Sequence, residues 1–194
     1  MSQEKVNVLD SAFAFALECH GEQTRPNGEP YVEHLLEVTE ILGQKLFITD
    51  EKMLVAGILH DVVEDTPCSL GDIELRFGTE VANLVRWLTY QKQADRKKAR
   101  KDYFTQLQQA PSDAIVIKLA DRLSNVQRLD THPSREKQKK YYHETVEKII
   151  PLAYHYPWFA LQFELWQEKF EKMYKENVFK KLIAEFQRII NGLL

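Results

Sequence analysis

Four ionisable residues stand close together at the end of the most apolar stretch of the chain. His60, Asp61, Glu64 and Asp65 follow an apolar run at 53–59. In a helix of about 3.6 residues per turn, His60 shares a face with Glu64, and Asp61 shares a face with Asp65. Buried charges cost several kcal/mol unless something pairs with them. An imidazole beside a carboxylate can face a divalent cation while further carboxylates orient water or exchange a proton, so the segment indicates a metal-dependent catalytic site.

Two further segments each offer a metal ligand. Asp121 directly follows the apolar run at 115–120, and His34 lies on a segment whose other residues predict a core-facing helix. With His60 and Asp61 they make a set of two nitrogen and two oxygen ligands with a total charge of −2, which a divalent ion would neutralise. This mixed set differs from a thiolate-rich structural zinc site and from an all-oxygen calcium site. It leaves coordination positions for water and a phosphate oxygen.

His34 and Asp121 also have simpler interpretations. A single His on an apolar helix is commonly a core residue whose ring nitrogens have ordinary hydrogen-bond partners. Asp121 can form an ion pair with Lys118, one turn earlier, or with Arg122. The sequence alone leaves these alternatives open.

The residues that would carry this chemistry lie on predicted helices. Turn signals are sparse, alternating strand patterns are almost absent, and apolar residues recur at helical spacing along the chain. The helices that position the candidate site are expected at 6–19, 31–46, 50–66 and from 112 to about 130. The third is apolar on nearly every side, which is typical of a buried helix, and Pro67 should end it at Thr66. We predict an all-α fold, a single bundle of about eight to ten helices spanning residues 1–194.

The composition is that of a folded chain outside the membrane. Of 194 residues, 44% are apolar and 28% are charged, with only 7 Gly and 7 Pro, which excludes a disordered chain. Because no run of about 18 uncharged apolar residues occurs, we expect no membrane partner, and the N-terminus lacks the pattern of a signal peptide. The net charge of −3 argues against a nucleic-acid partner.

The cysteine content favours a reducing compartment. Cys19 and Cys68 lie far apart in the sequence and outside any C-x-x-C arrangement. Two cysteines are too few to stabilise a secreted protein of this size by disulfide cross-links. We therefore expect a cytoplasmic protein.

Several strings of the sequence resemble one known family. The string HDVVEDT at 60–66 resembles the signature of HD-domain phosphohydrolases. The similarity is specifically to the hydrolase domain of the bifunctional alarmone synthetase/hydrolases and to their small stand-alone relatives. It continues in QTR at 23–25, GEPY at 28–31 with His34, FGTEV at 77–81 and IKLADRLSN at 117–125. The resemblance covers about the first four fifths of the chain.

The resemblance implies an HD-domain bundle, a metal, a reaction and a set of residue roles. The ion would be a single manganese, and its ligands would be His34, His60, Asp61 and Asp121. Glu64 and Asp65 would activate or steer the attacking water. Arg25 would stack on a guanine base, and Asn125 would contact the nucleotide. The implied reaction removes the 3′ pyrophosphate of guanosine tetra- or pentaphosphate, and the absence of a downstream synthetase domain implies a stand-alone hydrolase.

A basic segment at 92–102 offers positive charge for phosphate groups. It contains six Lys or Arg residues against Asp95 and Asp102. A guanosine polyphosphate carries more negative charge than one divalent cation offsets, so we expect members of this segment to face the substrate. We take Lys97 and Lys98, together with Arg128, as candidate substrate-binding residues. The alternative is a solvated helix face.

The chain departs from the family pattern where the base and the phosphates are contacted. Leu35 follows His34 where the family usually has Pro, and Pro26 and Tyr90 stand where the family has basic residues. The family often places an Arg at the position of Gln127. None of these changes removes a metal ligand, so they bear on the choice of nucleotide more than on hydrolysis.

Two other function classes stay open. One is an HD-domain phosphohydrolase that acts on another nucleotide, such as a nucleoside monophosphate or NADPH. The other is a nucleotide-binding module that keeps the metal fold and has lost most of its catalysis, although Glu64 and Asp65 argue against it. A cyclic-dinucleotide phosphodiesterase is disfavoured because its Gly-Tyr-Pro signature is absent.

Overall fold

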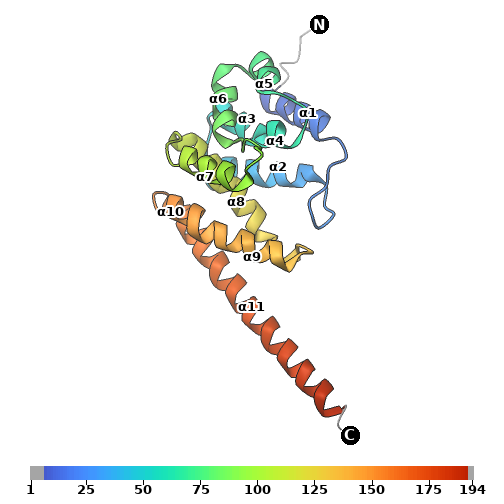
Figure 1. The fold of residues 1–194 in the computed structure, drawn as a ribbon. Helices are drawn as coiled ribbons and strands as arrows, with labels where there is room; N and C mark the ends of the chain where they lie inside the picture. Colours follow the sequence, from blue (N-terminus) through green and yellow to red (C-terminus); the bar gives the residue numbers. More distant parts are fainter. Residues whose placement is uncertain (1–6, 192–194) are drawn as a thin grey trace. The chain divides into compact units, whose positions relative to one another are not determined.

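The computed structural model describes the backbone of residues 7–191 and the side chains of residues 7–176. Within these residues every regular element is helical, and extended backbone pairs only at an isolated bridge between Thr24 and Pro30. Nine of the helices in this part of the chain have eight residues or more (Figure 1). These observations confirm the predicted all-α fold of about eight to ten helices.

The helices divide into those that carry the candidate site and those that surround it. Site residues lie on or beside α2 (Tyr31–Glu40), α3 (Glu51–Leu59), α4 (Val62–Asp65) and α8 (Ser112–Gln127). The surrounding helices are α1 (Val8–His20), α5 (Leu70–Phe77), α6 (Thr79–Leu88), α7 (Arg96–Leu107), α9 (Arg135–Glu144) and α10 (Ile150–Ala153). Wider π-helical turns follow α2 at Ile41–Lys45 and α9 at Thr145–Ile149, and a 3-10 turn follows α8 at Leu129–Thr131.

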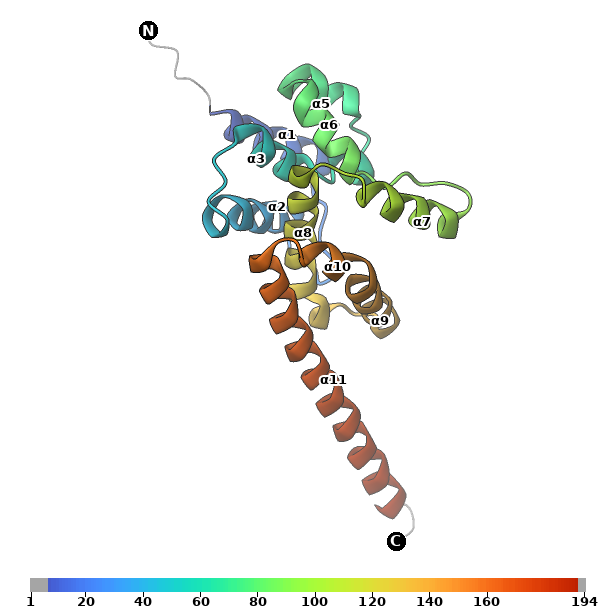
Figure 2. The same ribbon diagram turned by 90° about the vertical axis from the view of Figure 1, so that its left-hand side faces the viewer.

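The chain forms two compact units, one that runs to Leu152 and one that starts at Ala153. The second unit consists mainly of α11 (Pro157–Asn191), a continuous helix of 35 residues (Figure 2). Among the described residues no helix combines the length and the apolar character needed to cross a membrane. A single domain over residues 1–194 stays a prediction, and residues 1–6 and 192–194 of it lie outside the described part.

α3 lies at the centre of the first unit because its sequence leaves no polar face. Its residues from Met53 to Leu59 are all buried, and α1, α2, α6 and α8 pack around it. The Asp50 carboxylate caps the helix by accepting the Met53 N–H at 3.0 Å. Gly57 permits a close approach, because a Cβ at this position would lie 2.5 Å from Cδ1 of Leu42. The apolar run therefore fixes in the core the helix whose end carries the first candidate ligands.

The helix predicted at 50–66 is split in two. α3 ends at Leu59 and α4 begins at Val62, with Asp61 between them at φ −102° and ψ −5°. The predicted continuity is therefore wrong, whereas the predicted end at Thr66 is confirmed. Adjacent side chains of a regular helix point in different directions, so the break is what allows Asp61 to turn toward its neighbour His60.

The two cysteines form a disulfide, which the sequence analysis did not predict. Cys19 lies in the last turn of α1 and Cys68 follows α4, and their Cα atoms are 6.3 Å apart. Because α1 packs against α4, residues 49 positions apart in the sequence come within bonding distance. The spacing of the two cysteines along the chain gave no sign of this pairing, and the cytoplasmic location stays a prediction.

Candidate functional site

The structure brings the four predicted metal ligands together. One ligand atom from each of His34, His60, Asp61 and Asp121 can be chosen so that all four lie within 4.8 Å of one another. Nε2 of His34 lies 3.2 Å from Nε2 of His60, and Oδ2 of Asp61 lies 3.0 Å from the same His60 nitrogen. Oδ1 of Asp121 lies 3.3 Å from Nε2 of His34. Three separate helical segments thus place their ligands around one point.

The chemistry of this set fits a divalent cation. The Nδ1 atom of His60 lies 2.8 Å from the carbonyl oxygen of Gly57, which turns the Nε2 atom toward the centre. Two ring nitrogens and carboxylate oxygens so close together require a positive charge among them. Burial acts to lower the pKa of His60, but the Asp61 and Asp121 carboxylates raise it to about 10. A metal-ligating imidazole is neutral, so binding of a cation at His60 would compete with protonation of the ring.

Each aspartate ligand has hydrogen-bond partners besides the histidines. Asp121 receives a hydrogen bond from Nζ of Lys118 at 2.7 Å on one oxygen and from Nδ2 of Asn125 at 2.6 Å on the other. Asp61 receives a short hydrogen bond from the hydroxyl of Tyr31. Burial acts to raise the pKa of the Asp121 carboxyl, but Lys118 and the two histidines hold it well below its usual range. Both ligands are therefore carboxylates, which is the form that binds a metal.

The two predicted catalytic acids lie beside this cluster. Oε2 of Glu64 accepts the backbone N–H of Tyr90 at 3.0 Å, and Lys92 donates to the carbonyl oxygen of Glu64 at 2.8 Å. Asp65 is more exposed, and its carboxylate lies 3.9 Å from the ammonium of Lys92. Burial, followed by the charge of Asp61, raises the pKa of both carboxyls. A carboxyl with a raised pKa beside a metal site is suited to proton exchange.

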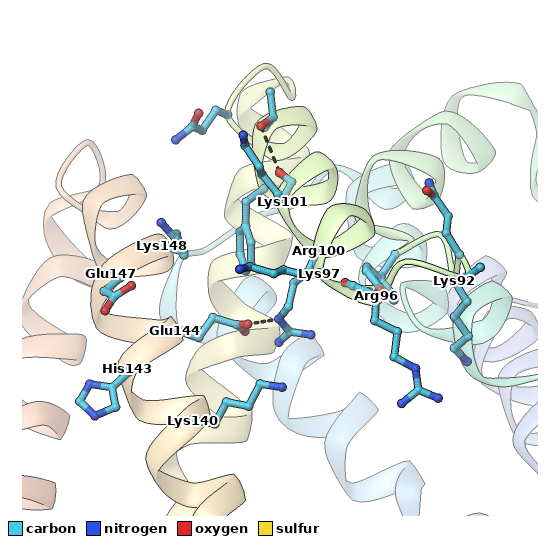
Figure 3. A pocket seen from close by; sticks show the side chains of 16 residues that line it. Lys92, Arg96, Lys97, Arg100, Lys101, Lys140, His143, Glu144, Glu147 and Lys148 are labelled. Carbon is cyan, nitrogen blue, oxygen red and sulfur yellow. Dashed lines mark hydrogen bonds and ion pairs between the residues drawn. The ribbon is translucent and has the colours of Figure 1, made fainter.

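A basic cavity of about 1360 Å³ opens between α7 and the segment that contains α9 and Thr145–Ile149 (Figure 3). The cavity is lined by basic side chains from both walls, among them Arg96, Lys97, Arg100, Lys101, Lys140 and Lys148. Lys98 lies outside this lining, and its ammonium pairs with Asp102 at 2.5 Å. Of the two lysines chosen from the sequence, the geometry therefore favours Lys97 as a contact to a phosphate.

A second cavity, of about 360 Å³, adjoins the first, since Arg100 and Lys140 line both. Its lining also includes the three residues predicted to contact the nucleotide from other segments, which are Arg25, Asn125 and Arg128. Asn125 links this cavity to the metal cluster because its amide donates to Asp121. The side chain of Arg25 is buried and paired with Glu37. The structure thus groups these three predicted residues, while their contact with a nucleotide stays a prediction.

Sequence reasoning missed several residues that support the site. Glu37, Ser124 and Tyr31 each contact a predicted ligand or a predicted substrate-binding residue. Glu37 is a charged residue one turn after His34 on a helix read as core-facing, and this unexplained charge was the available signal. Tyr31 and Ser124 stand within the strings that carried the resemblance, where their types gave no indication of a contact.

The all-helical fold and its two-histidine, two-aspartate cluster are the features expected of an HD-type metal-dependent domain. Residues 12–155 match the family model described as the HD domain. The chain therefore belongs to the HD domain family. This confirms the resemblance found in the sequence.

The most informative relatives are alarmone hydrolases. The chain is 36% identical over 172 residues to guanosine-3′,5′-bis(diphosphate) 3′-pyrophosphohydrolase of Aquifex aeolicus, which covers 87% of this chain and 24% of that protein. It is 36% identical over 129 residues to the same enzyme, MESH1, of Drosophila melanogaster, which covers 63% of this chain and 72% of that protein. The chain spans about a quarter of the length of the bacterial relatives that it matches.

A solved structure supports the same grouping. It is titled as a metazoan orthologue of SpoT that hydrolyses ppGpp, and it superimposes with a TM-score of 0.70 at 31% sequence identity. The match covers 78% of this chain and 88% of that structure. The chain therefore shares the fold of that structure over most of its length.

Proposed function

We propose that this chain is a metal-dependent guanosine-3′,5′-bis(diphosphate) 3′-pyrophosphohydrolase, which removes the 3′ pyrophosphate of (p)ppGpp. The observation that carries the proposal is the convergence of His34, His60, Asp61 and Asp121 within 4.8 Å. The basic cavity, whose lining includes Tyr90 and Lys92 in contact with Glu64, supports a highly charged nucleotide as substrate. The named activities of the similar proteins support the same reaction.

We propose manganese as the ion, held by the four clustered ligands, because mixed nitrogen and oxygen ligation suits such a divalent cation. When bound, the ion lowers the pKa of water and draws charge from a phosphoryl oxygen. Glu64 accepts the proton that the attacking water loses, and Asp65 helps to orient that water. Both carboxyls adjoin the cluster, and their raised pKa values bring proton exchange nearer to neutral pH.

The predicted site residues outside the metal cluster and the two catalytic acids bind the nucleotide. Arg25, Asn125 and Arg128 line the smaller cavity and would hold the nucleoside portion. Lys97 and its basic neighbours line the larger cavity and would offset the phosphate charges that the metal does not neutralise. Lys98 would contribute only after leaving its partner Asp102.

The proposal includes a cytoplasmic location and a small-molecule partner. A guanosine polyphosphate is a nucleotide, and the basic residues line two adjoining open cavities, of which the smaller, about 360 Å³, has the size of a small-molecule site. The Cys19–Cys68 disulfide is more typical of an oxidising compartment, so the location needs its own measurement. Localising the full chain in its native cell and titrating its thiols there would provide it.

The test is an assay with three substrates and separate detection of the two phosphate products. Purified protein and Mn²⁺ are incubated with guanosine tetraphosphate, a nucleoside monophosphate or NADPH. Pyrophosphate released from guanosine tetraphosphate alone supports the proposal. Orthophosphate released from either other compound, without pyrophosphate from the first, assigns the chain to a different HD phosphohydrolase. Bound Mn²⁺ without turnover of any compound would indicate a binding module.

A further inference from the structure

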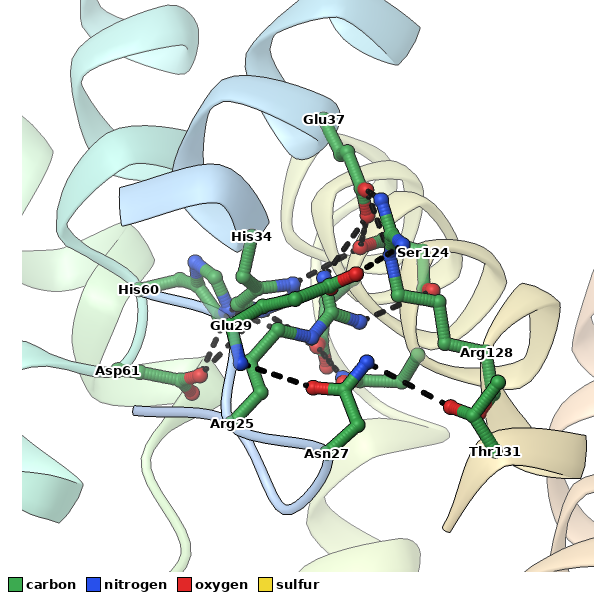
Figure 4. A network of polar contacts seen from close by, with 12 residues as sticks. Arg25, Asn27, Glu29, His34, Glu37, His60, Asp61, Ser124, Arg128 and Thr131 are labelled. Carbon is green, nitrogen blue, oxygen red and sulfur yellow. Dashed lines mark hydrogen bonds and ion pairs between the residues drawn. The ribbon is translucent and has the colours of Figure 1, made fainter. Parts of the chain in front are cut away.

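Glu37 is the central acceptor of a polar network that connects the metal cluster with the smaller cavity (Figure 4). Its Oε2 atom accepts a hydrogen bond from Nη1 of Arg25 at 2.9 Å and another from the hydroxyl of Ser124 at 2.6 Å. Its Oε1 atom accepts from Nε of Arg128 at 2.8 Å, and a second nitrogen of that guanidinium pairs with the same oxygen. Three groups from distant parts of the sequence therefore share one carboxylate on α2.

The contact with Ser124 determines which nitrogen of His34 carries a proton. Ser124 is fully buried, and its single hydroxyl hydrogen is directed to Glu37. The same oxygen lies 2.9 Å from Nδ1 of His34, so it must accept a hydrogen bond from that nitrogen. With the proton on Nδ1, the Nε2 atom of His34 presents a lone pair to the cation position. Glu37 thus orients a metal ligand through Ser124.

The contacts with the two arginines extend the network to the smaller cavity. Arg25 and Arg128 both line this cavity, beside Asn125. Arg25 also donates to the carbonyl oxygen of Ser124 at 3.3 Å, and Arg128 also pairs with Glu29 at 2.8 Å. A guanidinium held on a carboxylate keeps a fixed direction, which a planar ligand such as a nucleobase requires.

The ionisation of Glu37 agrees with its contacts. Burial acts to raise the pKa of its carboxyl, but hydrogen bonds from Arg128, Ser124 and Arg25 together lower it. Glu37 is therefore an acceptor on both oxygens at neutral pH. A glutamine at this position would present an NH₂ group to one set of donors, so it cannot satisfy both sets.

We infer that Glu37 is a positioning residue that couples the metal ligand His34 to the two arginines of the nucleotide cavity. Through Ser124 it sets the proton position on His34, and directly it sets the direction of Arg25 and Arg128. The nucleotide half of this inference rests on the proposed function. The metal half does not, because it concerns only side chains of the chain and the ion that they bind.

The metal half is tested with Mn²⁺ alone, by calorimetric titration of metal-free protein. Loss of a group that orients a metal-ligating histidine typically weakens binding by about 10–100-fold, and we expect this for Glu37→Gln and for Ser124→Ala. Because both act through one path, the double variant should bind Mn²⁺ no more weakly than the weaker single variant. The matched control is Glu40→Gln, one turn further along α2, where the carboxylate pairs only at the surface with Lys45.

The nucleotide half is tested with the same variants at saturating Mn²⁺ and with guanosine tetraphosphate as substrate. Glu37→Gln should raise KM roughly tenfold, the size of one lost charge-assisted hydrogen bond, whereas Ser124→Ala should change KM less than twofold. If Glu37 had only a structural role, Glu37→Gln would lower the yield of folded enzyme, and the folded enzyme would not show this difference in KM from Ser124→Ala. Circular dichroism and thermal melting of each variant check that the fold is retained.

Three results would overturn the inference. The first is Mn²⁺ affinity within twofold of wild type in folded Glu37→Gln. The second is that the losses of Mn²⁺ affinity in Glu37→Gln and in Ser124→Ala are additive in the double variant. The third is weaker Mn²⁺ binding in Glu37→Gln with an unchanged KM, which would remove the coupling. If wild-type protein hydrolyses no nucleotide, the proposed function fails, and the titrations still decide the metal half.

Discussion

The ammonium of Lys118 lies 2.7 Å from Oδ2 of Asp121, one turn further along α8, with 12% and 4% of their side chains exposed. The other oxygen of Asp121 faces the histidines of the metal cluster. The ion pair, one of the two alternatives left open by the sequence, is therefore present, and the same side chain also lies in the cluster that could hold a metal. Lys118 offsets one of the two negative charges of the cluster before any cation binds.

Lys118→Met should destabilise the metal-free protein more than the metal-loaded protein. Removal of one partner of a buried ion pair typically costs about 3–5 kcal/mol, because it leaves a charge without a partner. A bound cation would replace part of the lost charge at Asp121. Denaturant unfolding with a chelator and with Mn²⁺ measures both values, with Lys45→Met at the surface as control. Equal losses in the two conditions would contradict this role of Lys118.

Substitutions in the cluster and in the adjacent acid should separate metal binding from turnover. Asp61→Ala should abolish metal retention, because it removes an oxygen ligand that lies 3.0 Å from His60. Glu64→Gln should retain the metal and slow turnover by about 10²–10⁴-fold, the usual contribution of a general base. Metal content by elemental analysis and single-turnover rates give the two readouts. An unchanged rate in Glu64→Gln would exclude Glu64 from proton transfer.

Acid should weaken the fold through Glu144. Its carboxylate pairs with Arg100 and with Arg122, whose Nη2 lies 2.9 Å away. Burial acts to raise the pKa of Glu144, but the two arginines lower it below its ordinary value of 4.5. The stability that Glu144 contributes is therefore complete above about pH 4.5 and is lost as the pH falls through the lower folded-state pKa.

The free energy of unfolding between pH 6 and pH 3 tests this prediction. Glu144→Gln should be less stable than wild type at pH 6 and should lose less stability on acidification. Glu147→Gln, on the exposed side of the following turn, serves as the control. Parallel pH curves for wild type and Glu144→Gln would show that Glu144 does not carry the acid sensitivity.

The disulfide should stabilise the isolated protein. Cys19 and Cys68 close a loop across 49 positions of sequence, and a link over such a loop typically contributes about 2–4 kcal/mol. A reductant should therefore lower the melting temperature of the wild type to that of the Cys19→Ser/Cys68→Ser variant. The variant itself should not respond to the reductant. If wild type and variant have the same melting temperature when no reductant is present, the bond adds no stability.

The fold class and the four-residue cluster could be predicted because both depend on local patterns. Helical spacing of apolar residues identified the helices, and charged residues within apolar segments identified His60, Asp61 and Asp121. When their helices pack into the core, these charged side chains require groups of opposite charge or hydrogen-bond partners. The convergence of the cluster follows from that requirement, and the structure confirms it.

The remaining features depend on how helices pack, which one sequence pattern does not contain. The break at Asp61 occurs in a segment with good helical character, where the periodicity of the residues gives no sign of it. The Cys19–Cys68 bond depends on the packing of α1 against α4. Glu37 meets Ser124 across 87 positions of sequence, a distance over which local periodicity carries no information.

The contacts that the four ligands make with other residues affect how purified samples of this protein should be compared. The four ligands are contacted within the protein by Lys118, Tyr31, Ser124 and the Gly57 carbonyl. We therefore expect this site to form before a metal binds, unlike that of a zinc finger, and to accept different divalent ions. The specific activity of a purified sample should then vary with the trace-metal content of the growth medium and buffers, even when every molecule is correctly folded.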